Sequence, residues 1–173
     1  MCSLNFLSQN LELLPMSATS IEEVGETSPD DEKKEFPVSV NWVQKMQFIG
    51  SDEHNHSVVI DTSPAGGGEN SGPTPMRLLL MAVACCTAMD VVDILQKSRQ
   101  NLTGLSVFSR GVQNEEYPRY LKEIHLKYVL EGKDLAKDRV ERAIRLSEEK
   151  YCSVGATVSG KAKIFIKYDI REK

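Results

Sequence analysis

One uninterrupted apolar segment, Leu78 to Cys86, constrains the fold of this chain more than any other feature. It belongs to a longer stretch, Leu78 to Met89, that places apolar residues on every side of a helix. Such a helix has to be covered all round, so we expect it to be buried rather than to lie on one face of a sheet. Arg77 and Asp90 close the segment at about half of the roughly 20 residues that a membrane span requires. We therefore predict no membrane association.

The patterns on both sides of this helix predict an α+β fold with antiparallel strands around the buried, cysteine-bearing helix. Thr74 is placed to cap that helix, and Pro75 suits its first position. Period-2 alternation predicts strands, and a stripe of apolar residues at helical spacing predicts a second, amphipathic helix. The expected elements are strands within residues 36–62, a loop at 63–75, the buried helix to about residue 99, strands at 102–113 and 120–131, a helix at 134–151 and a closing strand at 162–170.

The size of the chain predicts a single domain with a tail and a partner subunit. Residues 1–35 are rich in Ser, Glu, Asp and Thr and have no sustained periodicity, so we expect a flexible acidic tail before a domain at 36–173. Roughly 140 ordered residues in one thin layer are a small number to enclose a helix that is apolar all round. A homodimer is therefore the physical expectation.

Charge and cysteine usage limit the partners and the compartment. A formal net charge of -4 argues against nucleic acid as the main partner, which would need clustered Lys and Arg. Four cysteines in 173 residues do not form the dense framework of a small secreted protein. The first 32 residues contain no Lys or Arg, whereas a signal or transit peptide would require them. We therefore expect a cytoplasmic protein that acts on small molecules or on protein.

Two cysteines far apart in the chain, Cys86 and Cys152, suit a redox thiol pair if the fold brings them together. By default, a cysteine in an apolar helix is a small core side chain. Adjacent helical residues point about 100° apart, so at most one of Cys85 and Cys86 can face Cys152. Cys152 lies where the second helix is expected to end, and a thiol there reaches a cleft more readily.

Two segments carry a resemblance to a known family. GPTPMRLLLMAVACCTAMDVVDIL, residues 72–95, resembles the cysteine-helix motif of the OsmC/Ohr family, and EKYCSV, residues 149–154, resembles its second-cysteine motif. The resemblance implies an intertwined α+β homodimer that reduces organic hydroperoxides in oxidative stress defence. It places the attacking thiol on Cys86 and the resolving thiol on Cys152, and it leaves Cys85 as a packing residue. An external dithiol would reduce the resulting disulfide, and no cofactor is implied.

The chain departs from the family pattern at the residues that activate the first thiol. Hydroperoxidases of the family use an Arg from the N-terminal strands, held by a Glu ten residues before the cysteine. Here that position is Met76, and residues 1–76 contain no Arg. Arg77 and Lys45 are the substitute candidates. The departure keeps open a binding or redox-sensing protein with little peroxidase activity, and a purely structural dimer.

His54 and His56, in the polar segment DEHNH, form the one pattern that suggests a metal ligand pair. No cysteine or third histidine stands near them in the sequence, and two histidines in a polar turn are ordinary surface residues. The sequence therefore predicts no metal site.

Overall fold

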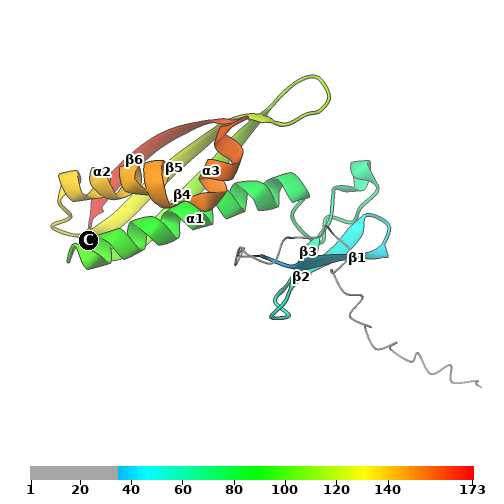
Figure 1. Cartoon of the computed structure of the whole chain (residues 1–173), viewed down its shortest axis with the longest axis horizontal. Helices are drawn as coiled ribbons and strands as arrows, with labels where there is room; N and C mark the ends of the chain where they lie inside the picture. The colour runs from blue at the N-terminus through cyan, green and yellow to red at the C-terminus, as the bar shows by residue number, and fades with distance from the viewer. Residues whose placement is uncertain (1–34) are drawn as a thin grey trace, which may run out of the picture.

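The computed structural model describes residues 35–173, so the expected acidic tail lies outside the described residues except for its last member. Two three-stranded sheets and three α-helices make up the described part (Figure 1). The elements, in chain order, are β1 (Val38–Gln44), β2 (Gln47–Asp52), β3 (Ser57–Ile60), a 3₁₀ turn (Pro64–Gly66), α1 (Pro75–Lys97), β4 (Asn101–Gln113), β5 (Leu121–Lys133), α2 (Lys137–Leu146), a π-helical turn (Ser147–Tyr151), α3 (Ser153–Ser159) and β6 (Lys163–Glu172).

The N-terminal sheet is the predicted antiparallel meander, in the order β1, β2, β3. Its register places one set of side chains on a common face, because residues directly opposite each other in a ladder point the same way. That face carries Gly50 and the apolar residues Val38, Val40, Trp42, Phe48, Val58 and Ile60, with Asp52 as its one charged residue, opposite Val38. Much of it is exposed, and Trp42 keeps 66 % of its surface accessible. In a single chain this apolar face is largely uncovered.

The C-terminal sheet has the order β4, β5, β6 and corrects one prediction. The pair β4 and β5 is antiparallel, whereas β5 and β6 run parallel. Parallel neighbours cannot be joined by a tight hairpin and need a crossover connection. Here α2, the π-helical turn and α3 form that crossover, so the strands are not all antiparallel as the sequence suggested.

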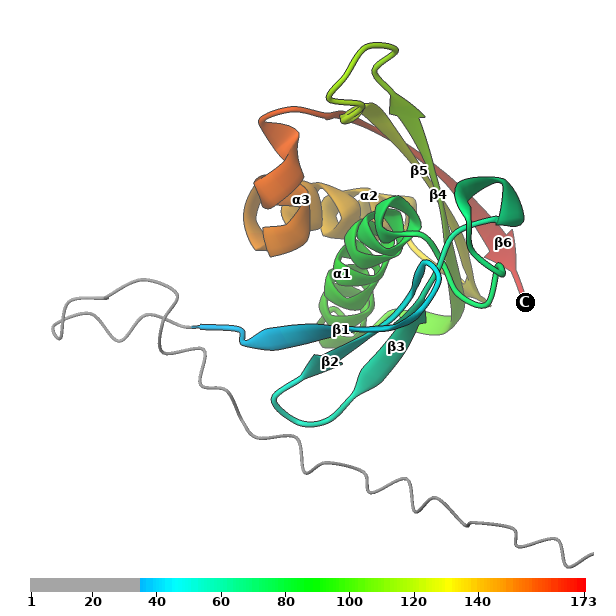
Figure 2. The same cartoon turned by 90° about the vertical axis from the view of Figure 1, so that its right-hand side faces the viewer.

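All three α-helices pack on the same face of the C-terminal sheet (Figure 2). The strand β5 lies at the centre of that sheet. Its alternating residues Ile124, Leu126, Tyr128 and Leu130 face the helices and are buried. The core consists of side chains from α1, β5 and α2, among them Val83, Val91, Leu95, Ile124, Tyr128, Leu130, Val140, Ala143 and Ile144. The helix that carries Cys86 is thus anchored along one side.

The predicted burial of α1 on every side is not found within one chain. Met81 and Met89 are exposed, and Met89 keeps 68 % of its surface accessible. By length and composition α1 is apolar enough to cross a membrane, with 28 % of its apolar window buried, but the core helix of a soluble protein meets the same criterion. The sequence pattern predicts that α1 is buried on every side, but the C-terminal sheet and α2 bury it on one side only.

The start of α1 is fixed as the sequence predicted. Thr74 is the N-cap, its hydroxyl accepts a hydrogen bond from the Arg77 amide, and Pro75 is the first helical residue. The preceding loop is organised by Asp61, which is only 1 % exposed. Its carboxylate accepts the amides of Thr62, Glu69 and Ser71 and the Ser71 hydroxyl. The hydrogen bonds from Ser71, first among these contacts, hold the pKa of Asp61 well below its usual range.

Candidate functional site

The fold brings the two predicted cysteines together. The sulfurs of Cys86 and Cys152 and a carboxylate oxygen of Asp90 all lie within 4.8 Å of one another. Cys86 and Asp90 are half-buried, and Cys152 is buried at 6 % exposure. Since the two cysteines come from α1 and from the crossover before β6, only the tertiary fold creates this cluster.

Helical periodicity places Asp90 beside Cys86. The two residues are four apart on α1, so they lie one above the other on the same face. Cys85, one position earlier, points away by about 100° and is exposed. Within a single chain, Cys85 is therefore not packed against other residues, as the resemblance implied it would be. The geometry agrees with the choice of Cys86, and not Cys85, as the partner of Cys152.

Cys152 is positioned by a change in helical geometry. The sequence predicted one amphipathic helix up to Tyr151, but α2 ends at Leu146 and a π-helical turn, Ser147–Tyr151, follows. Cys152 then leaves the helical conformation and becomes the N-cap of α3, where its sulfur accepts the Gly155 amide at 3.2 Å. Tyr151 is exposed as a result, instead of continuing the apolar stripe. The thiol therefore points inward at the junction of two helices.

A chain of buried hydroxyl groups ends at Asp90. The Ser147 Oγ donates to Asp90 Oδ2 at 2.8 Å, which uses its single proton. The Thr87 hydroxyl must then donate to Ser147 at 2.8 Å, and the Tyr128 hydroxyl must donate to Thr87 at 2.6 Å. All three hydroxyl residues are at most 3 % exposed. The chain of donors therefore runs in one direction, from the buried hydroxyls toward the half-buried carboxylate.

The surroundings of the site favour the neutral form of its buried groups. Burial raises the pKa of the Cys152 thiol to about 11, and the hydrogen bond with Cys86 and the charge of Asp90 act in the same direction, while the Gly155 amide opposes them. Burial likewise raises the pKa of Tyr128 to about 12. A carboxylate thus lies within 4.8 Å of both thiols, and a negative charge does not stabilise a thiolate.

The cluster lies between two grooves. One has a volume of about 510 Å³ and is lined by Cys152, by apolar side chains such as Val83 and Ile164, and by the charged residues Glu148, Glu149 and Lys163. The other has a volume of about 520 Å³, lies between α1 and α2, and is lined by Asp90 and other charged residues together with Ile94, Leu146 and Tyr151. Both walls mix apolar and charged side chains, and the grooves give access to the cluster from two sides.

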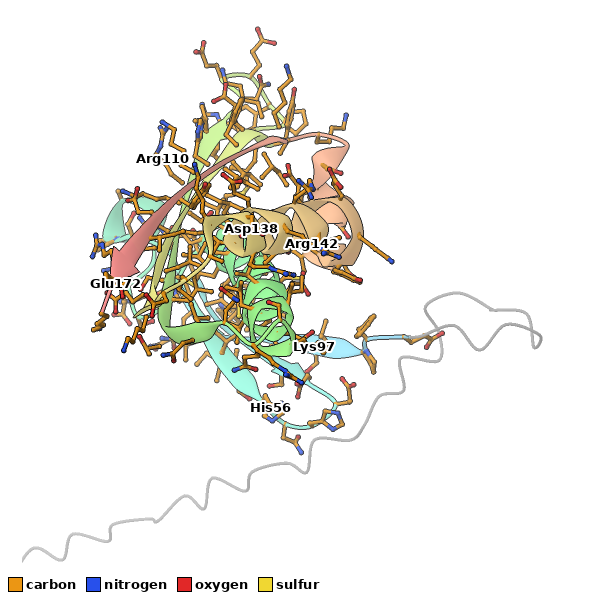
Figure 3. The ribbon with its side chains drawn as sticks, turned by 90° about the vertical axis from the view of Figure 1, so that its left-hand side faces the viewer. His56, Lys97, Arg110, Asp138, Arg142 and Glu172 are labelled. Atoms are coloured by element: carbon orange, nitrogen blue, oxygen red, sulfur yellow. The ribbon has the colours of Figure 1, made fainter. Side chains whose placement is uncertain are left out.

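The cations of the second groove lie at its rim. Lys97 near the end of α1 and Arg142 on α2 are seen on the same side of the molecule (Figure 3). Lys97 pairs with Asp93 at 2.7 Å, and Arg139 lies 3.7 Å from Asp138. These contacts hold two of the cations at the surface.

The two substitutes that the sequence offered for the missing Arg lie elsewhere. Arg77 is exposed at the start of α1, about 13 Å along the helix axis from Cys86 at 1.5 Å per residue. Lys45 forms an ion pair with Glu69 at 2.5 Å in the N-terminal part of the chain. Within one chain, neither residue takes the place of the missing cation at the thiols.

The histidine pair behaves as a surface feature. His54 and His56 are both strongly exposed, and the His56 ring interacts with Asp52 at 2.8 Å. Across residues 35–173, the group of His, Cys, Asp and Glu side chains close enough to share a metal ion is Cys86, Asp90 and Cys152. The prediction of no metal site considered the histidines and did not consider this group.

Sequence reasoning missed Asp90 and the hydroxyl chain behind it. Asp90 was treated only as the residue that closes the apolar run. Its spacing of four from Cys86 in a helix was the available signal, because that spacing places the thiol and the carboxylate on one face. No comparable signal links Ser147 or Tyr128 to the site, since both reach it through the tertiary fold.

Comparison with known proteins agrees with the fold and the two cysteine segments. The family model for OsmC-like proteins matches residues 67–167. Protein YhfA of Escherichia coli K12 is 37 % identical over 131 residues, which cover 76 % of this chain and 95 % of YhfA.

Solved structures show the same architecture. A hypothetical protein from Aquifex aeolicus superposes with a TM-score of 0.72 at 28 % identity, covering 82 % of this chain and 99 % of that one. An organic hydroperoxide resistance protein from Elizabethkingia anophelis has a TM-score of 0.60 at 11 % identity, over 80 % of this chain and 98 % of that one, and thus shares the fold. Together with the family model and the similarity to YhfA, these comparisons establish that the chain belongs to the OsmC-like family.

Proposed function

We propose that this protein is a thiol-dependent peroxidase that reduces organic hydroperoxides, with Cys86 as the attacking thiol and Cys152 as the resolving thiol. The single observation that carries the proposal is the placement of both sulfurs within 4.8 Å of each other, from two segments far apart in the chain. Structural neighbours named as organic hydroperoxide resistance proteins give further support at the level of the fold.

The chemistry requires two consecutive displacements at sulfur. The Cys86 thiolate attacks one peroxide oxygen, the O–O bond breaks, and the alkoxide leaves as an alcohol after taking up a proton. Cys86 is then a sulfenic acid. The Cys152 thiolate attacks that sulfur, hydroxide leaves as water, and a disulfide forms. An external dithiol returns both residues to thiols and is itself oxidised.

The groove beside Cys152 favours an organic substrate over hydrogen peroxide. Its volume of about 510 Å³ lies within the usual range for small-molecule sites, and apolar side chains form much of its wall. An alkyl or aryl group could bury its surface there while the peroxide group reaches the sulfurs.

A second candidate function is a small-molecule binding or redox-sensing protein with little peroxidase activity. The observation that favours it is the carboxylate of Asp90 beside the thiols, where an efficient peroxidase would place a cation. The raised pKa of Cys152 also favours this second candidate, because a resolving thiol has to ionise before it can attack a sulfenic acid.

The test is anaerobic reduction of the full chain, addition of one equivalent of cumene hydroperoxide, and mass spectrometry of the peptides. We expect a disulfide that joins the peptides of Cys86 and Cys152, and loss of peroxide consumption in Cys86→Ser. The matched control is Cys85→Ser, because Cys85 is the exposed neighbour of Cys86 and should be dispensable. Absence of the disulfide, with equal consumption by Cys86→Ser and wild type, would favour the binding protein.

We further propose that the working unit is a homodimer in the cytoplasm. The apolar face of the N-terminal sheet and the exposed apolar residues of α1 support the dimer, since each offers a surface that a second copy can cover. Proteins of the OsmC/Ohr family are typically soluble, and a reducing compartment would keep the thiol pair in its active form.

A further inference from the structure

We propose that Cys86, Asp90 and Cys152 form a binding site for a thiophilic divalent cation, with Zn²⁺ as its ligand. Two sulfurs and a carboxylate oxygen, all within 4.8 Å of one another, converge from α1 and from the crossover before β6. The site goes beyond the proposed peroxidase function, because it needs only the reduced thiols and the folded chain.

The spacing of the donors fits a tetrahedral ion. With Zn–S bonds of about 2.3 Å and Zn–O bonds of about 2.0 Å, donors on one tetrahedral zinc stand roughly 3.4 to 3.8 Å apart. The observed limit of 4.8 Å therefore needs adjustments of at most about 1.4 Å. Thiolate ligands select zinc and softer ions over magnesium or calcium, and three protein ligands leave a fourth position open for water or another small ligand.

The ligands are held by hydrogen bonds of the kind that surrounds metal sites. Asp90 Oδ2 accepts the Ser147 hydroxyl at 2.8 Å, which orients the carboxylate. The Cys152 sulfur accepts the Gly155 amide at 3.2 Å, which leaves its remaining lone pairs for an ion. Behind Ser147, the buried hydroxyls of Thr87 and Tyr128 continue the support. The donor set is therefore preorganised before an ion arrives.

Ion binding and disulfide formation exclude each other, because both use the same two sulfurs. A bound Zn²⁺ would block peroxide from Cys86, and oxidation of the pair would remove two of the three ligands. If the proposed peroxidase chemistry holds, the ion has to dissociate first; one hydroperoxide then takes up two electrons and two protons from the free thiol pair, becomes alcohol and water, and leaves a disulfide that cannot bind the ion again until it is reduced.

The test is a calorimetric titration of the reduced, metal-free full chain with Zn²⁺. A second titration, with Co²⁺, uses the absorption spectrum of the bound ion to report its ligands. We expect one ion per chain and a thiolate-to-cobalt charge-transfer band. Cys86→Ser and Cys152→Ser should weaken Zn²⁺ binding by more than about 100-fold, and Ser147→Ala by about 10-fold to 100-fold. Asp90→Asn should also weaken binding, whereas Cys85→Ser, the exposed neighbour, should bind as wild type does.

Alkylation of the wild-type chain gives a second measurement that needs no variant. Zn²⁺ should protect Cys86 and Cys152 from alkylation and leave Cys85 reactive. Unchanged affinity in Cys86→Ser, a cobalt spectrum without the charge-transfer band, or equal alkylation with and without Zn²⁺ would overturn the site. Zinc binding without peroxide consumption would leave the site standing, and peroxide consumption without zinc binding would overturn the site alone.

Discussion

Ser147 is the side chain through which α1 and the segment before Cys152 are joined. Its hydroxyl accepts from Thr87 and donates to Asp90, and the residue is fully buried. Any change at this position therefore affects the buried hydroxyls of Thr87 and Tyr128 and, through them, the support of the half-buried Asp90.

Ser147→Ala is expected to lower the free energy of unfolding by about 1 to 3 kcal/mol, because it removes the hydroxyl that donates to Asp90 and leaves the buried Thr87 hydroxyl without the acceptor of its proton. Urea denaturation followed by circular dichroism would measure the change. The control is Ser159→Ala, an exposed serine whose hydroxyl donates only to a carbonyl of its own helix, with an expected change within about 0.5 kcal/mol. Equal stability of the two variants would contradict the importance of the network.

The sequence led to the two cysteines but not to the carboxylate between them. Cys86 and Cys152 stand in segments with a recognisable pattern, whereas Asp90 reads as the ordinary polar end of an apolar run. Its role depends on what faces α1, and that is Cys152 and Ser147 from a distant segment. A carboxylate in a helix carries no local sign of such a partner.

The short helix α3 depends on the sulfur of Cys152. This sulfur accepts the Gly155 amide and caps a helix of only seven residues. In a disulfide the position of this sulfur is tied to the partner cysteine, so it cannot keep the geometry in which the free thiol caps the helix.

We expect the disulfide form to show faster amide hydrogen exchange in α3, first at Gly155, than the reduced form, because the cap is weakened on oxidation. Mass spectrometry of exchanged peptides from both forms would measure it. The middle of α1, around the buried Val91, serves as the internal reference and should exchange equally in both forms. Identical protection of α3 in the two forms would show that its cap does not depend on the thiol.

Local patterns predicted the helices and strands better than their pairing. Thr74 and Pro75 fixed the start of α1, and alternation identified β5 with its buried Ile124 and Tyr128. The sequence does not predict the helix α3, because SVGATVS is short, contains a glycine and offers only Val154 and Val158 as an apolar stripe. The parallel pairing of β5 and β6 was missed as well, since strand direction is set by the crossover rather than by the alternation of either strand.

The molecule as a whole exposes large apolar side chains on α1 and on the N-terminal sheet. Contiguous exposed apolar surface of this kind marks an interaction site. On the N-terminal sheet it includes Val38, Val40 and Trp42, each at least 60 % exposed.

Val40→Glu is therefore expected to shift the proposed dimer toward monomer, because it would bury a charge in the interface without a partner. Sedimentation velocity at several protein concentrations would measure the distribution. The matched control is Asn41→Glu, which places the same charge on the opposite face of β1 and should leave the dimer intact. A wild-type chain that sediments as a monomer at every concentration would contradict the proposal.

The parallel pairing of β6 with β5 also bears on how the protein is made. A ribosome delivers α1 with Cys86 before it delivers β6, Lys163–Glu172, which follows the crossover that carries Cys152 and pairs with β5. A chain without β6 would hold both thiols but not the strand to which this crossover leads. The assembly of the thiol pair thus waits for a strand that is made after both cysteines.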